Sequence, residues 1–185
     1  MGVINKEQYD LQLLTRKTNT AIEFCQNPNN ISYVAQALKI EESFPYFSLN
    51  GAVCLVEGHH NDPGTFHGNP HIPCLIQCDQ GFTLHIKWQT RGKMANFLCG
   101  KWKVDILTEK WGKDETCLPE PYNQKEVEWD CDGNYHCKIT VPPNTMEEGL
   151  YKFAVCVTMC STCGKNIPAP IAGFVELPAI KFYKG

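Results

Sequence analysis

One segment in the last quarter of the chain constrains the fold more than any other. Within residues 150–159 every second side chain is a large apolar group, and Lys152, Cys156 and Thr158 are among the residues that alternate with them. In order, the large apolar groups are Tyr151, Phe153, Val155, Val157 and Met159. Because successive side chains of a strand point to opposite faces, this row lies on one face of an extended segment. The segment therefore predicts a central strand with one face against an apolar core.

The same two-residue period recurs along the chain from residue 50 onward. It marks further strands at residues 52–56, 82–88, 102–106, 127–129, 135–141 and 171–183, the last of them interrupted at Pro178. The total is then seven strands, and the Gly- and Pro-rich connections between them have the spacing of a β-sandwich.

Two local signals refine this pattern. Trp102 is expected in the core of the third strand, with Trp88 as the competing candidate. Asp132 followed by Gly133 predicts a tight hairpin, because this pair suits the left-handed backbone of a type I′ turn. The hairpin would join the strands at 127–129 and 135–141.

The approach to the strand at 150–159 resembles that of the immunoglobulin-like and fibronectin-III-like β-sandwiches. Glu147, Gly149 and Tyr151 match the acidic, glycine and tyrosine positions of the tyrosine corner in that superfold. Phe153 stands where the family has its second cysteine, so the resemblance extends to the strands and not to the disulfide. It implies a mainly β fold, a seven-stranded immunoglobulin-like antiparallel β-sandwich. Such a superfold does not by itself name a function.

Residues 1–49 predict a different organisation, a short N-terminal helical extension. The apolar residues between 7 and 24 follow a helical period, which residues 26–30 break. A second short helix is expected at residues 32–42, with Val34 and Leu38 spaced along it and Pro45 at its end. The expected domains are a helical extension at 1–49 and a β-sandwich at 50–185.

Charge and cysteine content limit the function classes and the compartment. The 17 basic and 20 acidic side chains leave a net charge of −3, and no nucleic-acid partner is expected, because such partners usually meet a basic face. No run of about 18 apolar residues is present, so no membrane span is expected. The odd count of eleven cysteines and the lack of an apolar stretch at the first residues predict a reduced, cytoplasmic protein.

Cys160 and Cys163, followed by a glycine, resemble one half of a zinc knuckle. Zinc needs four ligands, and in an immunoglobulin-like sandwich three connections meet at one end of the molecule. Those connections carry Cys99, Cys131 and the Cys160/Cys163 pair, so a structural zinc site at these four residues is one interpretation. Cys137 is a further candidate ligand. A redox dithiol and a plain cysteine-bearing turn are the alternatives.

Residues 58–74 hold four of the six histidines of the chain, beside Asp62 and Cys74. The histidines are His59, His60, His67 and His71. Imidazoles and a carboxylate suit zinc or another divalent metal. The prolines and glycines of the segment prevent a helix from ordering these ligands, so the alternative is a solvated loop. This loop is expected at the opposite end of the sandwich from Cys160.

Three functions from different classes fit these patterns. The leading hypothesis is a non-enzymatic module for protein binding or assembly, in which end loops or a sheet edge contact a protein partner or a second copy. The second is a lipid or small-ligand carrier, because residues 73–74 and 81–84 resemble the ML lipid-recognition sandwiches, which bind a ligand between their sheets. The third is a metal-dependent enzyme that uses residues 59–74. Zinc is the cofactor that the metal hypotheses imply.

Overall fold

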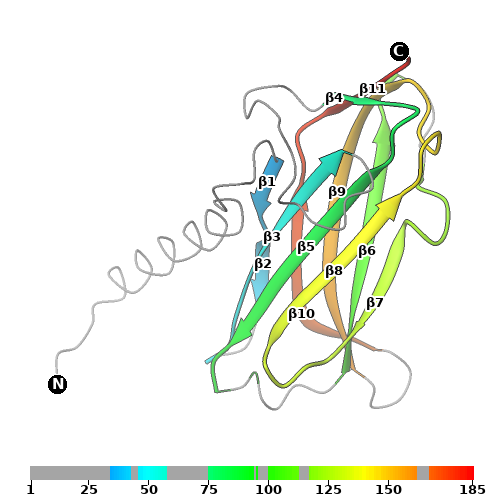
Figure 1. Ribbon diagram of the computed structural model, residues 1–185. Coiled ribbons are helices and arrows are strands. Elements are labelled where there is room, and N and C mark those ends of the chain that lie inside the picture. Colours follow the sequence, from blue (N-terminus) through cyan, green and yellow to red (C-terminus); the bar gives the residue numbers. More distant parts are fainter. Residues whose placement is uncertain are drawn as a thin grey trace, which may run out of the picture.

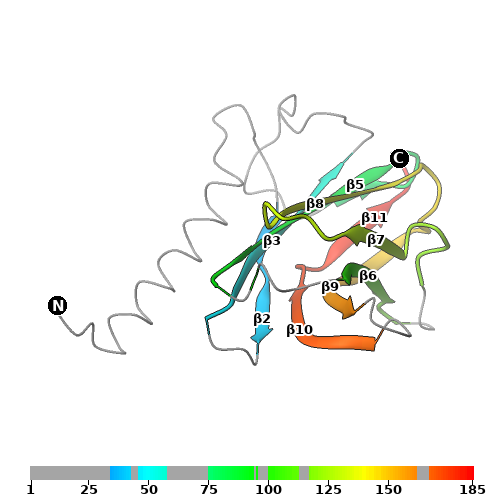
Figure 2. The same ribbon diagram turned by 90° about the horizontal axis from the view of Figure 1, so that it is seen from below.

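The computed structural model describes residues 34–42, 46–57, 75–93, 95, 100–112, 117–161 and 167–185. These residues form eleven strands and no α-helix. The strands lie in two sheets that pack face to face as two layers (Figure 1 and Figure 2). The mainly β, two-sheet class expected from the alternation is therefore confirmed.

The first sheet has four strands in the order β1, β3, β5, β8, and every neighbouring pair is antiparallel. They are β1 (Val34–Ala37), β3 (Ser48–Glu57), β5 (Phe82–Arg91) and β8 (Asn134–Val141). The strand β5 is central, because all ten of its residues pair with β3 and eight of them also pair with β8.

The second sheet is built around β9. This strand pairs antiparallel with β6 on one side and with β10 on the other, while β7 continues the sheet beyond β6 and β2 continues it beyond β10. At the start of β9, β11 pairs antiparallel with it and β4 pairs parallel with β11. The bounds are β2 (Lys39–Glu42), β4 (Leu75–Gln77), β6 (Gly100–Lys110), β7 (Gln124–Glu128), β9 (Gly149–Ser161), β10 (Ile167–Glu176) and β11 (Ile180–Tyr183).

The apolar row of β9 lies at the centre of the core, and each of its five members is at most 1% exposed. Two aromatic groups fill the space between the sheets around it. One group consists of Trp88, Trp102 and Tyr135, and the other of Phe82, Phe153 and Phe182. Trp102 is fully buried, as expected, and the ring of Trp88 lies 5.8 Å from it.

All seven expected strands are present, but the strand count is wrong. The last of them divides into β10 and β11 around Pro178, at the interruption that proline predicts, and β1, β2 and β4 are additional. The three additional strands are only three or four residues long. Segments this short contain too few residues to establish a two-residue period, so their strand character depends on the partner strand.

The expected helix at residues 32–42 is wrong, because β1 and β2 occupy this segment. β1 pairs with β3 and β2 pairs with β10, so the chain passes from one sheet to the other at Leu38. There the Leu38 N–H donates to the Gly51 carbonyl at 2.9 Å. An eleven-residue helix is marginal on its own, and pairing with two sheets satisfies the same backbone groups. The expected helix at residues 7–24 lies outside the described residues.

The expected hairpin at Asp132 and Gly133 is also wrong. β7 pairs with β6 in the second sheet, whereas β8 pairs with β5 in the first, so the turn between them crosses from layer to layer. Glu126 and Glu128 of β7 contact Lys101 of β6, with Nζ to carboxylate distances of 2.9 and 3.5 Å. These cross-strand ion pairs favour β6 as the neighbour of β7.

Candidate functional site

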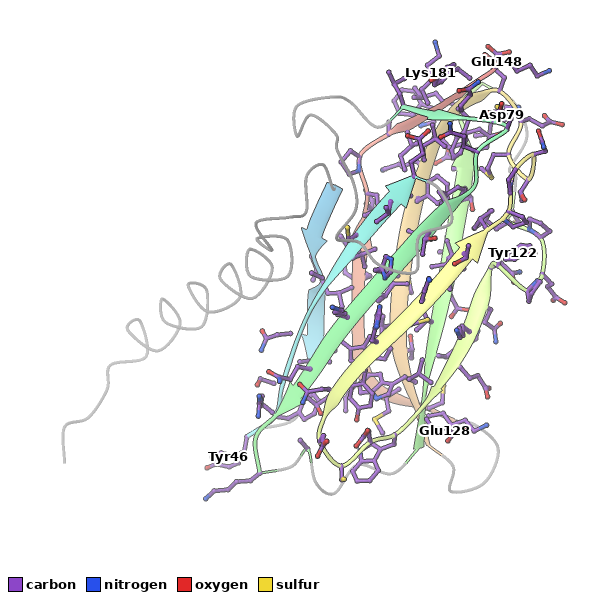
Figure 3. All side chains as sticks on the ribbon, viewed as in Figure 1. Tyr46, Asp79, Tyr122, Glu128, Glu148 and Lys181 are labelled. Carbon is purple, nitrogen blue, oxygen red and sulfur yellow. The ribbon has the colours of Figure 1, made fainter. Side chains whose placement is uncertain are left out.

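The connections predicted to share one end of the sandwich are attached to strand ends that lie together. Lys101, at the start of β6, is opposite Glu128 at the end of β7 and opposite Cys160 near the end of β9. The Thr90 N–H donates to the Gly133 carbonyl at 2.8 Å, which brings the end of β5 to the same place. Figure 3 shows Tyr46 and Glu128 at this end, with Asp79, Glu148 and Lys181 at the other. We call Tyr46, residues 91–93 and residues 129–133 the loop end.

The turn at residues 130–133 is held by its own hydrogen bonds. The Asp132 N–H donates to Asp130 Oδ1 at 2.9 Å, and the Gly133 N–H donates to the Asp130 carbonyl at 3.1 Å. The same carbonyl accepts a hydrogen bond from the Tyr135 hydroxyl at 3.1 Å. An aspartate that binds the backbone two residues on is a common way to fix a turn. The side chains of this turn are therefore presented on a well-defined backbone.

A hollow of about 240 Å³ lies between this turn and the end of β5. Residues 90–92 and Ala95 line one side, and residues 130–133 line the other. Asp130, Cys131 and Asp132 are all exposed, and their ligand atoms lie within 4.8 Å of one another. Two carboxylates and a thiol could hold a metal ion, and they also give the hollow an acidic border.

Tyr46 stands beside this hollow with an unusual backbone. Its φ of 61° is in the left-handed region, and 76% of the residue is exposed. Gly92, with a φ of 106°, faces it so closely that a Cβ at this position would collide with the Tyr46 carbonyl oxygen. A non-glycine residue in this region costs of the order of 1–3 kcal/mol, and such strain occurs preferentially at functional sites.

Of the four cysteines predicted as zinc ligands, the structure describes two. Cys131 belongs to the exposed turn, while Cys160 is half-buried on the outer side of β9 and is not a member of the group around Cys131. Cys99 and Cys163 lie outside the described residues. Cys137, the further candidate ligand, is buried in the core and is not a member of the group around Cys131.

Six of the described cysteines are free thiols. They are Cys78, Cys117, Cys131, Cys137, Cys156 and Cys160. Cys54, Cys78 and Cys137 are buried, as expected for small apolar residues, whereas Cys117 and Cys131 are exposed. In the part of the chain that the structure describes, no helix is long and apolar enough to cross a membrane.

The four histidines of residues 58–74 lie outside the described residues, but both strands that flank this segment are placed. Glu57 ends β3 opposite Phe82, and Leu75 begins β4 opposite Lys181. The Gln77 N–H donates to Glu57 Oε1 at 3.3 Å, so the two flanks meet. Lys181 is at the end of the molecule opposite Tyr46 (Figure 3), so the segment starts and finishes away from the loop end.

A second candidate site, which the sequence analysis missed, lies on the outer face of the first sheet. His85 of β5 and His136 of β8 are stacked, with His85 Nδ1 3.2 Å from His136 Nε2. Burial lowers the pKa of His85 to about 4, with His136, Lys138 and Lys87 contributing. Burial and nearby lysines also lower the pKa of His136. The two histidines are 51 residues apart, so only the pairing of β5 with β8 reveals the cluster.

Comparisons with known proteins add no family. No protein-family model matches the chain, and no curated protein matches it. Among solved structures, the CARDB domain of the PF1109 protein from Pyrococcus furiosus, in complex with di-metal ions, aligns with 11% identity and a TM-score of 0.40. The alignment covers 78% of this chain and 100% of that chain. At this level of similarity the match carries no argument about function, and the fold assignment rests on the strand pairing.

Proposed function

We propose that this chain is a protein-binding module that contacts its partner with the loop end of the sandwich. The observation that carries the proposal is Tyr46, a large aromatic side chain that is 76% exposed on a left-handed backbone beside Gly92. Tyrosine contributes a large contact area at low entropic cost and is enriched among residues that dominate binding energy. A strained, exposed tyrosine is therefore better explained by a contact than by the stability of the fold.

The surroundings of Tyr46 support this reading. Connecting segments on a rigid sandwich are where binding residues are commonly found. The hollow beside Tyr46 is bordered by the exposed carboxylates of Asp130 and Asp132 on one side and by Arg91 on the other. Charge complementarity then favours a partner that places a lysine or arginine against the two aspartates and an apolar surface on the tyrosine ring.

The proposal is tested by site-specific photo-crosslinking followed by reconstitution. A photo-reactive residue replaces Tyr46 in one variant and Lys181, at the opposite end, in a control variant. We expect a protein crosslinked from position 46 and not from position 181. Binding of that purified protein to the intact chain should then weaken about tenfold, or 1.4 kcal/mol, in Tyr46→Ala and in Asp132→Asn.

Two results would overturn this proposal. One is a purified partner that binds Tyr46→Ala and Asp132→Asn as tightly as the natural chain. The other is crosslinking of equal yield from both ends. If the crosslinked protein is a second copy of the chain, sedimentation should show a dimer that Tyr46→Ala dissociates, and the module is then one of assembly.

The remaining hypotheses are a lipid carrier, a structural zinc site and a metal-dependent enzyme. For a lipid carrier, a ligand between the sheets would have to open the two aromatic groups, whose rings lie 5.3–6.3 Å from their neighbours. No observation on the described residues favours that. Zinc at Cys99, Cys131, Cys160 and Cys163, and an enzyme that uses residues 59–74, stay predictions. Metal analysis of the purified chain and of Cys131→Ser tests the zinc site.

A further inference from the structure

The second sheet ends at β7, and the outer edge of this strand is open to solvent. Among the described strands, β7 pairs with β6 alone, and Figure 1 shows it as the outermost strand on that side of the sheet. Every residue of β7 is exposed except Val127, which is half-buried. An open edge presents backbone N–H and C=O groups that can pair with another extended chain.

The register with β6 identifies which backbone groups lie on this edge. The Ile106 N–H donates to the Asn123 carbonyl at 2.7 Å, and this pair continues the register of β6 with β7. Hydrogen-bonded and non-hydrogen-bonded pairs alternate in an antiparallel ladder, so the odd-numbered residues of β7 also point their N–H and C=O groups at β6. The even-numbered residues, Gln124, Glu126 and Glu128, therefore point theirs away from β6.

The other described strands at sheet ends are less suited to accept a further strand. β8 ends the first sheet, and the Lys125 ammonium group donates to the Lys138 carbonyl of that strand at 3.0 Å. The strands β1, β2 and β4 are only three or four residues long. Of the described edges, β7 is therefore the best candidate for strand addition.

The side chains beside the open edge are acidic. Glu126 and Glu128 are opposite the lysines of β6, on the face of the sheet turned away from the core, and 49% and 77% of their side chains are exposed. Acidic side chains continue at every second position through Asp130 and Asp132. The ammonium group of Lys101 contacts both glutamates, so one positive charge faces two carboxylates. The edge therefore keeps negative charge that a partner could meet.

We propose that β7 binds an extended, basic segment of a partner protein, which adds to the second sheet as a further strand. In this binding mode main-chain hydrogen bonds supply affinity and alternate side chains supply specificity. Lysine or arginine at every second position of the segment would face Glu126 and Glu128, whereas the same edge of a second copy would bring like charges together. Charge complementarity therefore favours a basic partner over self-association. The inference does not depend on Tyr46, which lies outside β7.

The test is a titration of the intact chain with a short peptide of alternating lysine and valine, at constant ionic strength because salt screens exposed charges. NMR gives the affinity and the hydrogen-exchange rate of each backbone amide. We expect saturable binding that slows exchange at Glu126 and Glu128 and leaves Lys125 and Val127, whose N–H groups point at β6, unchanged. The same peptide with N-methylated amides keeps its charge but cannot donate to the edge, and it should not bind.

Substitutions separate the contribution of the charges from that of the backbone. Glu126→Gln and Glu128→Gln should each weaken binding about threefold, or 0.65 kcal/mol, the size of one cross-strand ion pair. Glu126→Pro also removes an edge N–H and should weaken binding by more than about tenfold. Proline is tolerated on an edge strand where its missing N–H faces solvent. Glu148→Gln, at the opposite end of the molecule (Figure 3), should leave the affinity unchanged within about twofold.

Four results would overturn the proposal. They are no saturable binding of the peptide, equal binding of the N-methylated peptide, equal loss of affinity in Glu126→Gln and Glu148→Gln, and protection of the Glu126 and Glu128 amides that rises with the concentration of the chain alone. The last result would identify a second copy as the occupant. Tyr46→Ala should bind the peptide within about twofold of the natural chain, so this proposal and that of the loop end can fail separately. Slow exchange at residues 125 and 127 establishes that each variant keeps the pairing of β6 with β7.

Discussion

The hydroxyl of Tyr135 donates a hydrogen bond to the carbonyl of Asp130, five residues earlier, at 3.1 Å. Tyr135 starts the inward row of β8, and its ring stacks on Trp88 with centroids 5.3 Å apart. The bond therefore links the turn between the two layers to the core. It fixes the backbone on which Asp130, Cys131 and Asp132 border the hollow of the loop end.

We expect Tyr135→Phe to lower the free energy of unfolding by about 1 kcal/mol, the net value of one hydrogen bond, because the Asp130 carbonyl keeps only its bond from the Gly133 N–H. Urea denaturation monitored by fluorescence measures this change. Tyr46→Phe is the matched control, because Tyr46 is 76% exposed and its hydroxyl can bond to water, so its midpoint should not move. Equal midpoints for both variants would show that the Tyr135 bond does not hold the turn.

The comparison of Tyr135 with Tyr151 shows which features of the fold a sequence pattern can predict and which it cannot. The sequence predicts a corner-type hydrogen bond at Tyr151, after Glu147 and Gly149. Among the described residues, the bond from a tyrosine to a backbone carbonyl upstream is made by Tyr135 instead. Tyr151 is buried against Phe182 and has the Lys110 ammonium 5.5 Å from its ring centroid. Alternation identified both strands correctly, but it does not specify where a hydroxyl finds its acceptor.

Alternation also does not specify which strands pair with each other, or which side chains come together in a candidate site. The long rows of β5, β6, β8 and β9 are visible because one face of each is buried, and that burial imposes a two-residue period. Pairing of β7 with β6 and of β1 with β3 depends on residues far apart in sequence. The cluster of His85 and His136 depends on pairing in the same way. Cysteine and histidine spacing indicates candidate sites at residues 58–74 and 160–163 instead.

Gly92 and Gly112 form a matched pair for testing whether the close approach of Gly92 holds the backbone of Tyr46 in place. Both have a left-handed φ, 106° and 89° respectively, so alanine at either position carries a backbone penalty of about 1–2 kcal/mol. A Cβ at Gly112 meets no atom within 4 Å, whereas one at Gly92 collides with the Tyr46 carbonyl. Gly92→Ala should therefore lose more unfolding free energy than Gly112→Ala and should weaken partner binding. Equal losses in denaturation would mean that the Tyr46 segment moves aside without cost.

Thiol reactivity should follow burial across the described cysteines. Cys117 and Cys131 are exposed and should react first with iodoacetamide, while Cys137 should stay unmodified until the chain unfolds. Burial that raises the pKa of Cys137 to about 11 also suppresses its reactive thiolate near neutral pH. Mass spectrometry of peptides after timed labelling gives the order. Early modification of Cys137 would indicate that β8 opens in the native state.

The last prediction concerns pH and His85. Burial, with help from His136, Lys138 and Lys87, lowers the pKa of this histidine from 6.5 to about 4 in the folded chain. Above pH 6.5 the group is neutral in both states and contributes nothing to the pH dependence. As the pH falls from 6.5 towards 4, the unfolded chain binds a proton that the folded chain does not, so stability decreases. The loss approaches about 3 kcal/mol and levels off below pH 4.

Urea unfolding between pH 7.5 and 4.5 tests this dependence. His85→Gln removes the titrating group and leaves the charges of Lys87 and Lys138 in place. The natural chain should therefore lose about 2–3 kcal/mol more than this variant as the pH is lowered. His136 also has a lowered pKa, so the variant keeps a smaller pH dependence of the same sign. Parallel curves for the two proteins would mean that His85 accepts its proton in the folded state as easily as in the unfolded one.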